Sequence, residues 1–287
     1  MRTPALHPQA FLRSLGFVLD KKPHQIDRLL LRSLSPEDRE SLQLIWAMRN
    51  AGYSDGLAMY GVPKTLKQAA LLFSHDWKRA EATMSWFHRI VDKLQPSSVT
   101  EMGCGAGFLL NYLQKEFQGL RLQGVDEADN LILIGSDLTG SELIRGDYLN
   151  TEPDGAYDLV ICDFGFDNAR FVPSQTTHSI AEIEGVRFCP GCSQDLKVQL
   201  DAYLKAWRQW VNMDGCLAIA GRFSNFGQLK ALVEAASEVG WYPSLQESTI
   251  LVVEAHGIIE RFPALLFVTG TEYGRPSLED LARFYVG

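Results

Sequence analysis

The chain has 287 residues, of which 46% are hydrophobic and 22% are charged, and its formal net charge is −8. No segment is long and apolar enough for a membrane helix, and the first residues lack the apolar core of a secretory signal. The five cysteines are an odd number scattered along the chain, which disfavours a disulfide framework. The acidic balance disfavours nucleic acid as a partner. We therefore expect a cytoplasmic protein without a membrane partner.

The N-terminal third predicts helices throughout. Apolar residues recur there at helical spacing, and Ser35-Pro36-Glu37-Asp38 combines a capping serine, a first-turn proline and first-turn acids. A loop at 53–63 contains Tyr53 and Tyr60, and a long helical stretch from Lys64 to Leu94 follows it. We expect residues 1–94 to form a helical subdomain that covers the site as a lid.

Strands and helices alternate from residue 95 onward, which predicts a doubly wound, mostly parallel sheet. The helical pattern between the strands supplies the crossovers, and an irregular insertion at 164–193 follows the fourth strand. The seven expected strands are Ser98–Met102, Leu120–Asp126, Glu142–Arg145, Tyr157–Asp163, Cys216–Ala220, Thr249–Glu254 and Ala264–Thr269. The expected fold is therefore a seven-stranded α/β domain over residues 95–287, preceded by an all-helical subdomain.

A glycine-rich turn joins the first strand to its helix. Gly103, Gly105 and Gly107 stand at every second position, directly before a helical pattern that starts at Phe108. Glycine lets the backbone approach a ligand closely, and the free N–H groups of a helix start attract negatively charged ligand groups. The turn therefore predicts a ligand site at the carboxyl ends of the strands.

Four features, in this order, resemble the class I S-adenosylmethionine-dependent methyltransferases. They are the Glu101–Gly107 stretch with its acid and three glycines, Asp126 at the end of the second strand, Gly146-Asp147-Tyr148 after the third, and the Tyr157–Asp163 strand. Asp214-Gly215-Cys216-Leu217 also resembles the lead into that family's fifth strand. The resemblance covers about Val99 to Thr269 and implies the Rossmann-like fold and S-adenosyl-L-methionine as cofactor.

The resemblance implies a role for each residue of the motifs. Glu101 would face the cofactor's ammonium, Asp126 would accept both ribose hydroxyls, and Asp147 would accept the adenine amino group with Tyr148 beside the ring. Asp163 and Phe164 would lie near the methyl group. The expected cofactor-binding residues are Glu101, Gly103, Gly105, Gly107, Asp126, Asp147, Tyr148, Asp163 and Phe164.

Two other functions remain open. A nicotinamide or flavin enzyme would carry Gly-x-Gly-x-x-Gly, but Phe108 and Leu110 stand where the third glycine would be needed. Glu101 just before the glycines also suits an ammonium better than a pyrophosphate. The second alternative is a catalytically inactive, methyltransferase-like interaction protein, which the cofactor motifs do not exclude.

The acceptor is expected to be a small molecule that offers an oxygen, nitrogen or carbon nucleophile. A helical lid and an insertion after strand four resemble small-molecule methyltransferases, and the Asn/Asp-Pro-Pro-Tyr/Phe stretch of nucleic-acid amino methyltransferases is replaced by Asp163-Phe164-Gly165-Phe166. Tyr53 and Tyr60 are candidates for contact with the acceptor. His178 and Asp167 are candidates for a catalytic base, because each can take a proton near neutral pH in a suitable environment. A homo-oligomer is possible.

Cys189-Pro190-Gly191-Cys192 is the most distinctive motif of the insertion. A Cys-x-x-Cys pair is typical of metal or redox sites, but a structural zinc site needs four ligands and the sequence has no second pair. From sequence alone we therefore interpret the motif as a tight turn and expect no metal.

Overall fold

The computed structural model describes residues 6–53, 57–255, 257–270 and 274–287. The main-sheet strands are β1 (Ser98–Met102), β2 (Arg121–Asp126), β3 (Ile144–Arg145), β4 (Tyr157–Asp163), β7 (Val211–Ala220), β8 (Tyr242–Pro243), β9 (Thr249–Ala255) and β10 (Ile258–Val268). Their order is β3-β2-β1-β4-β7-β10-β8, and β9 pairs with β10. The strands from β3 to β7 run parallel, whereas β10 is antiparallel to its neighbours. The expected doubly wound, mostly parallel sheet is confirmed.

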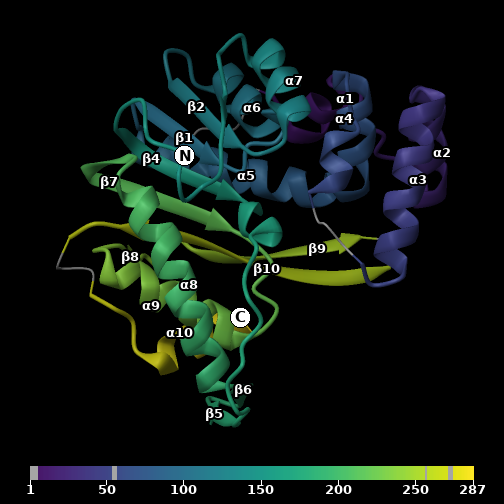
Figure 1. Cartoon of the computed structure of the whole chain (residues 1–287). Helices are drawn as coiled ribbons and strands as arrows, with labels where there is room; N and C mark the ends of the chain where they lie inside the picture. The colour runs from purple at the N-terminus through teal and green to yellow at the C-terminus, as the bar shows by residue number, and fades with distance from the viewer. Residues whose placement is uncertain (1–5, 54–56, 256, 271–273) are drawn as a thin grey trace.

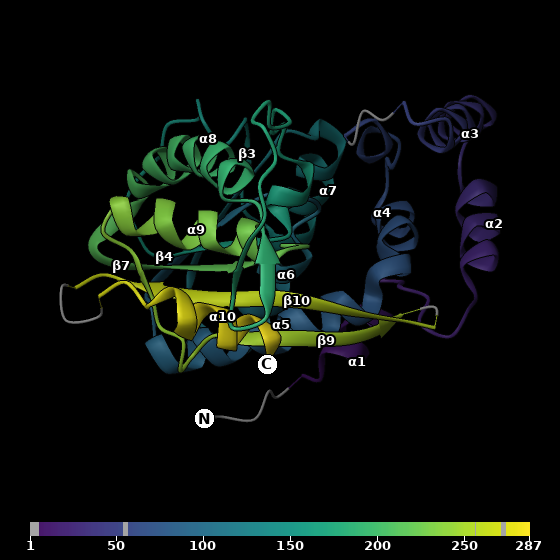
Figure 2. The same ribbon diagram turned by 90° about the horizontal axis from the view of Figure 1, so that it is seen from below.

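Helices cover both faces of this sheet, as Figures 1 and 2 show. The α-helices are α1 (Pro8–Ser14), α2 (Pro23–Ser33), α3 (Pro36–Asn50), α4 (Leu66–Phe73), α5 (Trp77–Leu94), α6 (Phe108–Glu116), α7 (Asp129–Thr139), α8 (Pro190–Arg208), α9 (Phe226–Glu238) and α10 (Leu278–Val286). Short 3-10 helices are η1 (Ala58–Gly61), η2 (Ser74–Asp76) and η3 (Gly165–Asn168). A separate hairpin consists of β5 (Ala181–Ile183) and β6 (Val186–Phe188).

Alternation along the strands divides the core into two layers. In β4, Leu159 and Ile161 pack with α1, α5 and α6, whereas Val160 and Cys162 pack with α8 and α9. All four side chains are fully buried. Successive side chains of a strand point to opposite faces, so a continuous apolar run is what a strand covered on both faces requires.

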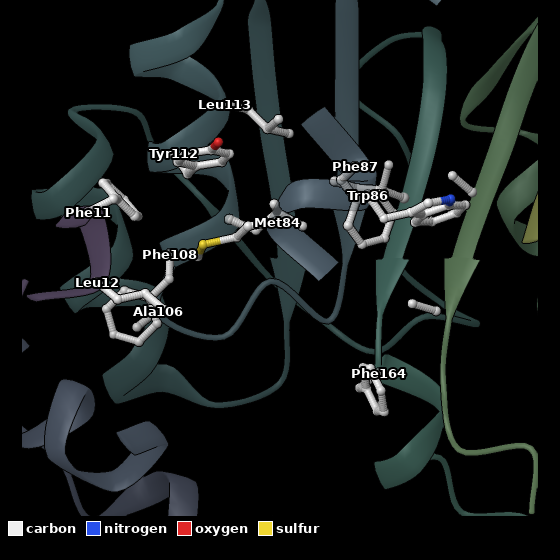
Figure 3. Packing of buried hydrophobic residues seen from close by; sticks show 14 of the residues in the cluster. Phe11, Leu12, Met84, Trp86, Phe87, Ala106, Phe108, Tyr112, Leu113 and Phe164 are labelled. Atoms are coloured by element: carbon white, nitrogen blue, oxygen red, sulfur yellow. The ribbon is translucent and has the colours of Figure 1, made fainter. Parts of the chain in front are cut away.

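The N-terminal helices belong to two different packing groups. Phe11 of α1 and Phe87 of α5 lie in the same core layer as the sheet, and Figure 3 shows Phe11 beside Tyr112 of α6. Helices α2, α3 and α4 form a smaller cluster around Leu30, Leu42 and Leu71. Helices α2 and α3 stand apart from the sheet, as both overall views show, whereas Ala69 and Ala70 of α4 also pack in the core layer of the sheet. The division at residue 94 stays a prediction, and α5 contributes to the core of the sheet.

Local signals located several elements correctly. Helix α3 starts as expected, because the Ser35 hydroxyl accepts the Asp38 N–H at 3.1 Å and donates to the Asp38 carboxylate at 2.7 Å.

Two expected elements have different bounds in the structure. The single helix expected from Lys64 to Leu94 is wrong, because η2 separates α4 from α5. The last strand begins at Ile258 rather than Ala264, and it forms a hairpin with β9 that extends toward α2 and α3 (Figure 2).

No helix in the described part of the chain is both long and apolar enough to cross a membrane.

Gly124 of β2 is a position where the fold depends on a missing side chain. A Cβ there would lie 2.7 Å from Cys104 Sγ and 2.8 Å from Leu110 Cδ1, behind the glycine-rich turn. We expect Gly124→Ala to lower the free energy of unfolding by about 1–3 kcal/mol through overpacking. Urea denaturation measures this change. Gly61→Ala is the matched control, because open space surrounds Gly61; equal stability losses in both variants would contradict this account.

Candidate ligand site at the carboxyl edge of the sheet

The turn after β1 has a backbone that only glycine adopts easily. Gly103, Gly105 and Gly107 all have positive φ, at 84°, 52° and 66°. A Cβ on Gly103 would lie 2.7 Å from the Tyr148 hydroxyl and 2.9 Å from the Gly165 Cα. The turn is therefore both conformationally and sterically restricted to glycine at Gly103, and it brings bare backbone to the carboxyl edge of the sheet.

Asp126, at the end of β2, fastens this turn. Its carboxylate accepts the Gly105 N–H at 2.8 Å and the Ala128 N–H at 2.9 Å. Burial raises the pKa of Asp126, and these backbone hydrogen bonds oppose the rise. A carboxylate has about four acceptor positions, so the two N–H groups leave capacity for ligand hydroxyls.

Two further carboxylates are buried close to Asp126. Glu101 of β1 is 3% exposed, and its Oε2 has no hydrogen-bond partner among the described residues. Burial raises its pKa well above the ordinary value, and the charges of Asp163 and Asp126 raise it further. Burial also raises the pKa of Asp163 to about 6, against the opposing effect of the Arg79 charge and of the Thr83 hydroxyl, which donates to Asp163 at 3.1 Å. Three acids therefore gather at this point without a full set of partners, and their raised pKa values show that ionising them all is unfavourable.

A cavity of about 330 Å³ opens over the turn. Seven of the nine expected cofactor residues line it: Gly103, Gly105, Asp126, Asp147, Tyr148, Asp163 and Phe164. Glu101 and Gly107 lie outside this lining. The structure thus brings residues from the ends of β1, β2, β3 and β4 together around one space, as the parallel topology requires.

Asp147 and Tyr148 have structural partners as well as positions in the cavity. The Asp147 carboxylate accepts the N–H groups of Leu149 and Asn150 at 2.7 and 3.0 Å, and the Asn150 side-chain amide at 2.7 Å. The Tyr148 ring makes edge contacts with Tyr203 and Trp207. Both residues are therefore held in place before any ligand arrives.

Phe164 forms the wall between this cavity and a larger one. It is 5% exposed and has φ of 59°, a left-handed conformation rare for a bulky residue. The guanidinium of Arg79 lies 4.3 Å from the centre of its ring, and that of Arg222 lies 5.6 Å away. Backbone strain of this kind clusters at functional sites.

The larger cavity is a cleft of about 1430 Å³. It shares five lining residues with the smaller cavity: Tyr60, Arg79, Phe164, Asn168 and Ala169. The two spaces therefore meet at Phe164. Neither Arg79 nor Arg222 belongs to a recognisable sequence motif. The position of Arg222 just after the parallel strand β7 was the one available signal, because ligand contacts concentrate at the carboxyl ends of such strands.

The two candidate tyrosines lie in different surroundings. Tyr60 stacks on Phe73 with ring centroids 5.7 Å apart and lines both cavities. Tyr53 is 71% exposed and lines neither. The neighbouring residues 54–56 of the predicted lid loop lie outside the described residues.

Asp167, a candidate base, lines the cleft but is engaged. Its Oδ2 pairs with the Arg222 guanidinium at 2.6 Å, and its Oδ1 accepts the Arg222 N–H at 3.2 Å. Both oxygens thus bind the same arginine, an arrangement that positions Arg222 beside Phe164. A base role for Asp167 stays a prediction.

His178, the other candidate base, is exposed and lies against the cysteine pair at the edge of the cleft. Its Nδ1 is 3.1 Å from Cys192 Sγ and 3.9 Å from Cys189 Sγ. Backbone N–H groups of Cys192 and Ser179, followed by the His178 side chain, lower the pKa of Cys189 to about 6. The sequence did not indicate that these three residues would meet, because His178 is separated from the pair by the β5–β6 hairpin. A base role for His178 also stays a prediction.

The charge and the shape of the site both suit the expected cofactor. An unpartnered buried carboxylate oxygen on Glu101, beside Asp126 and Asp163, suits a ligand that carries positive charge. The close approach allowed by Gly103 suits an extended chain lying on the backbone. A pyrophosphate would instead place negative charge against these acids.

Comparison with known proteins gives structural likeness only. No family model and no curated protein matches the chain. Among solved structures, the N-methyltransferase NodS from Bradyrhizobium japonicum WM9, in complex with S-adenosyl-L-homocysteine, is 12% identical with a TM-score of 0.48, over 67% of this chain and 87% of its own. Magnesium protoporphyrin IX methyltransferase from Synechocystis PCC 6803, with bound S-adenosylmethionine, is 12% identical with a TM-score of 0.45, over 79% and 95%. The ribosomal protein L11 methylase from Lactobacillus delbrueckii is 17% identical with a TM-score of 0.43, over 67% and 79%. These likenesses concern the fold alone.

The buried acids predict a pH-dependent stability. The raised pKa means that the folded chain keeps the Glu101 proton at pH values where the unfolded chain has lost it, so stability falls as pH rises above the ordinary glutamate pKa. Without ligand, we expect Glu101→Gln to be more stable than the parent at pH 8 by about 1 kcal/mol or more, and the gain to shrink toward pH 5.

Urea denaturation at the two pH values measures this difference. Glu142→Gln is the matched control, because Glu142 is exposed and should change stability little at either pH. A Glu101→Gln effect that does not vary with pH would show that Glu101 is ionised at a low pKa and would contradict the charge account.

Proposed function

We propose that the protein is an S-adenosylmethionine-dependent methyltransferase that acts on a small molecule bound in the larger cleft. The observation that carries this proposal is the cluster of buried acids at a glycine turn: Asp126 and Asp163 line a cavity that shares a wall with a second cavity, and the charges of both act on the buried Glu101 beside them. Ligands of doubly wound sheets bind in this position, outside the carboxyl ends of the strands.

The residues that line the smaller cavity, and the buried Glu101 next to it, have roles that their chemistry supports. The Glu101 carboxylate would balance the ammonium of the cofactor, and Asp126 would accept the ribose hydroxyls. Asp147 and Tyr148 would contact the adenine. Gly103 keeps the floor open, because any Cβ there would meet the Tyr148 hydroxyl. Asp163, whose Oδ1 lacks a partner among the described residues, would face the positive sulfonium side.

The chemistry supplied by the bound cofactor is an electrophilic methyl group on sulfur, open to direct displacement by a nucleophile. The protein's contribution is then mainly to hold the acceptor in line with that group and to exclude water. Phe164 suits this task, because it belongs to both cavities and two guanidinium groups fix its ring. The bond between Asp167 and Arg222 keeps the second of these groups in place.

The lining of the cleft supports a small amphipathic acceptor. Aromatic side chains such as Trp46, Phe171 and Phe223 provide apolar surface, and Arg49 and Arg222 provide positive charge. An oxygen, nitrogen or carbon nucleophile on such a molecule could reach the wall at Phe164. A small-molecule acceptor is therefore sufficient to account for this cleft, and we do not invoke a protein or nucleic-acid acceptor.

The ribose assignment is testable at Asp126. We expect Asp126→Asn to weaken S-adenosylhomocysteine binding at least about tenfold, because one ionised acceptor pair is replaced by a single neutral acceptor. Isothermal titration calorimetry measures the affinity, and Asp137→Asn is the control, since Asp137 is exposed on α7. Unchanged affinity in a folded Asp126→Asn variant would overturn the assignment.

The function itself is tested in two steps. The full chain should bind S-adenosylhomocysteine and should not bind NAD in competition with it; the reverse preference would identify a nicotinamide enzyme. Formation of S-adenosylhomocysteine from S-adenosylmethionine is then measured with panels of small amines, phenols and carboxylates. Cofactor binding without turnover on any panel would favour the non-catalytic, methyltransferase-like protein instead.

A further inference from the structure

The insertion after β4 contains the β5–β6 hairpin, which brings the residues just before β5 close to those just after β6. Strands β5 and β6 pair Ala181 with Phe188, and a two-residue turn of Glu184 and Gly185 joins them. Both turn residues have positive φ, at 48° and 76°, as the hairpin turns that match strand twist require. Because the hairpin closes on itself, His178, just before β5, is brought back to Cys189, just after β6.

Helix α8 then fixes the second cysteine beside the first. Cys189 is the residue preceding the helix, Pro190 is its first residue and Cys192 lies in its first turn. Gly191 is required there, because a Cβ would lie 2.6 Å from Thr176 Cγ2. The loop that carries His178 therefore packs directly on the Cys189–Cys192 turn.

Hydrogen bonds within this loop hold it in place. The Ser174 hydroxyl donates to Asp195 of α8 at 2.6 Å and accepts the Thr176 N–H at 3.2 Å. The loop is thereby tied to α8 on the side of His178. Partners of this kind orient the residues that bind a metal.

The three side chains have the separations of metal ligands. Their ligand atoms all lie within 4.8 Å of one another, and the Nδ1–Sγ distances are 3.1 and 3.9 Å. Tetrahedral zinc, with bonds of about 2.0 Å to nitrogen and about 2.3 Å to sulfur, separates such atoms by roughly 3.5–3.8 Å. The two observed distances bracket that value, so small side-chain shifts would complete the geometry.

We propose that His178 Nδ1, Cys189 Sγ and Cys192 Sγ bind a zinc ion, with a fourth position that faces the cleft. Two thiolates and an imidazole select zinc over magnesium or calcium, which prefer oxygen ligands. Among the described residues, no fourth histidine, cysteine or carboxylate joins the group. All three ligands line the larger cleft, so the remaining position is open to water or to a donor atom of a bound molecule.

This site differs from a redox disulfide at the same cysteines. A Cys-x-x-Cys disulfide needs no histidine, yet His178 is directed at both sulfurs by the hairpin and by the packed loop. The imidazole contact thus favours a metal, and it makes His178 a ligand rather than the free base that the sequence suggested. The proposal stands independently of the cofactor assignment.

Cobalt(II) provides the direct test, because its absorption reports thiolate ligands and their number. The reduced full chain, freed of metal, should bind a single Co²⁺ with a strong thiolate-to-metal band and tetrahedral visible bands, and Zn²⁺ should displace it. Cys189→Ser, Cys192→Ser and His178→Ala should each weaken binding more than the roughly 10–100-fold expected for loss of an outer-shell partner.

Cys216→Ser is the matched control, since Cys216 is a free cysteine outside the group. It should keep the cobalt spectrum and the affinity of the parent, and far-ultraviolet circular dichroism of each variant checks that it is folded. The proposal is overturned if the reduced parent gives no thiolate band. It is also overturned if folded His178→Ala retains the parent's spectrum and affinity, or if Cys216→Ser loses binding as the cluster variants do.

Discussion

The burial of three carboxylates at the carboxyl ends of β1, β2 and β4 is the constraint on which the rest of the site depends. Ionised groups out of water are costly unless a partner compensates them. Asp126 receives two backbone N–H groups, and Asp163 has Thr83 and the nearby Arg79 charge, but Glu101 Oε2 has no partner within the described chain. The fold therefore accepts a loss of stability at the point where a cationic ligand would restore the balance.

The same buried acids are surrounded by the glycine turn, the strained Phe164 and two guanidinium groups. The turn clears space above the acids, and Phe164 closes that space toward the cleft. Arg79, from helix α5, and Arg222, just after β7, both lie over the Phe164 ring. The smaller cavity and the larger cleft therefore share one wall, which is the arrangement that a transfer reaction between two bound molecules needs.

The sequence was sufficient where the signal is local. The central strand β4 is a near-continuous apolar run, and the glycine turn and Asp126 stand directly at strand ends, so parallel topology alone brings them together. The extent of β10 was not predictable, because its pairing with β9 depends on contacts across the hairpin rather than on its own pattern. Arg79 also carried no signal, since its place at the site depends on how α5 packs against the sheet.

The cysteine pair was visible in the sequence, but the third residue of its cluster was not predictable. Its spacing was visible, but its partner His178 comes from before a hairpin whose positive-φ turn uses Glu184 as well as a glycine. Sequence spacing therefore suggested an incomplete site and a tight turn. Only the folded insertion shows a third ligand atom beside the two sulfurs.

The claim that the acid cluster is a binding site for a cation is tested most directly by the protons released on binding. Calorimetric titration of S-adenosylhomocysteine near pH 7, in buffers of different ionisation enthalpy, counts them. The account predicts net proton release by the parent chain, as Glu101 ionises against the ligand ammonium, and none from Glu101→Gln. Binding with no proton release, or with equal release by both chains, would contradict it.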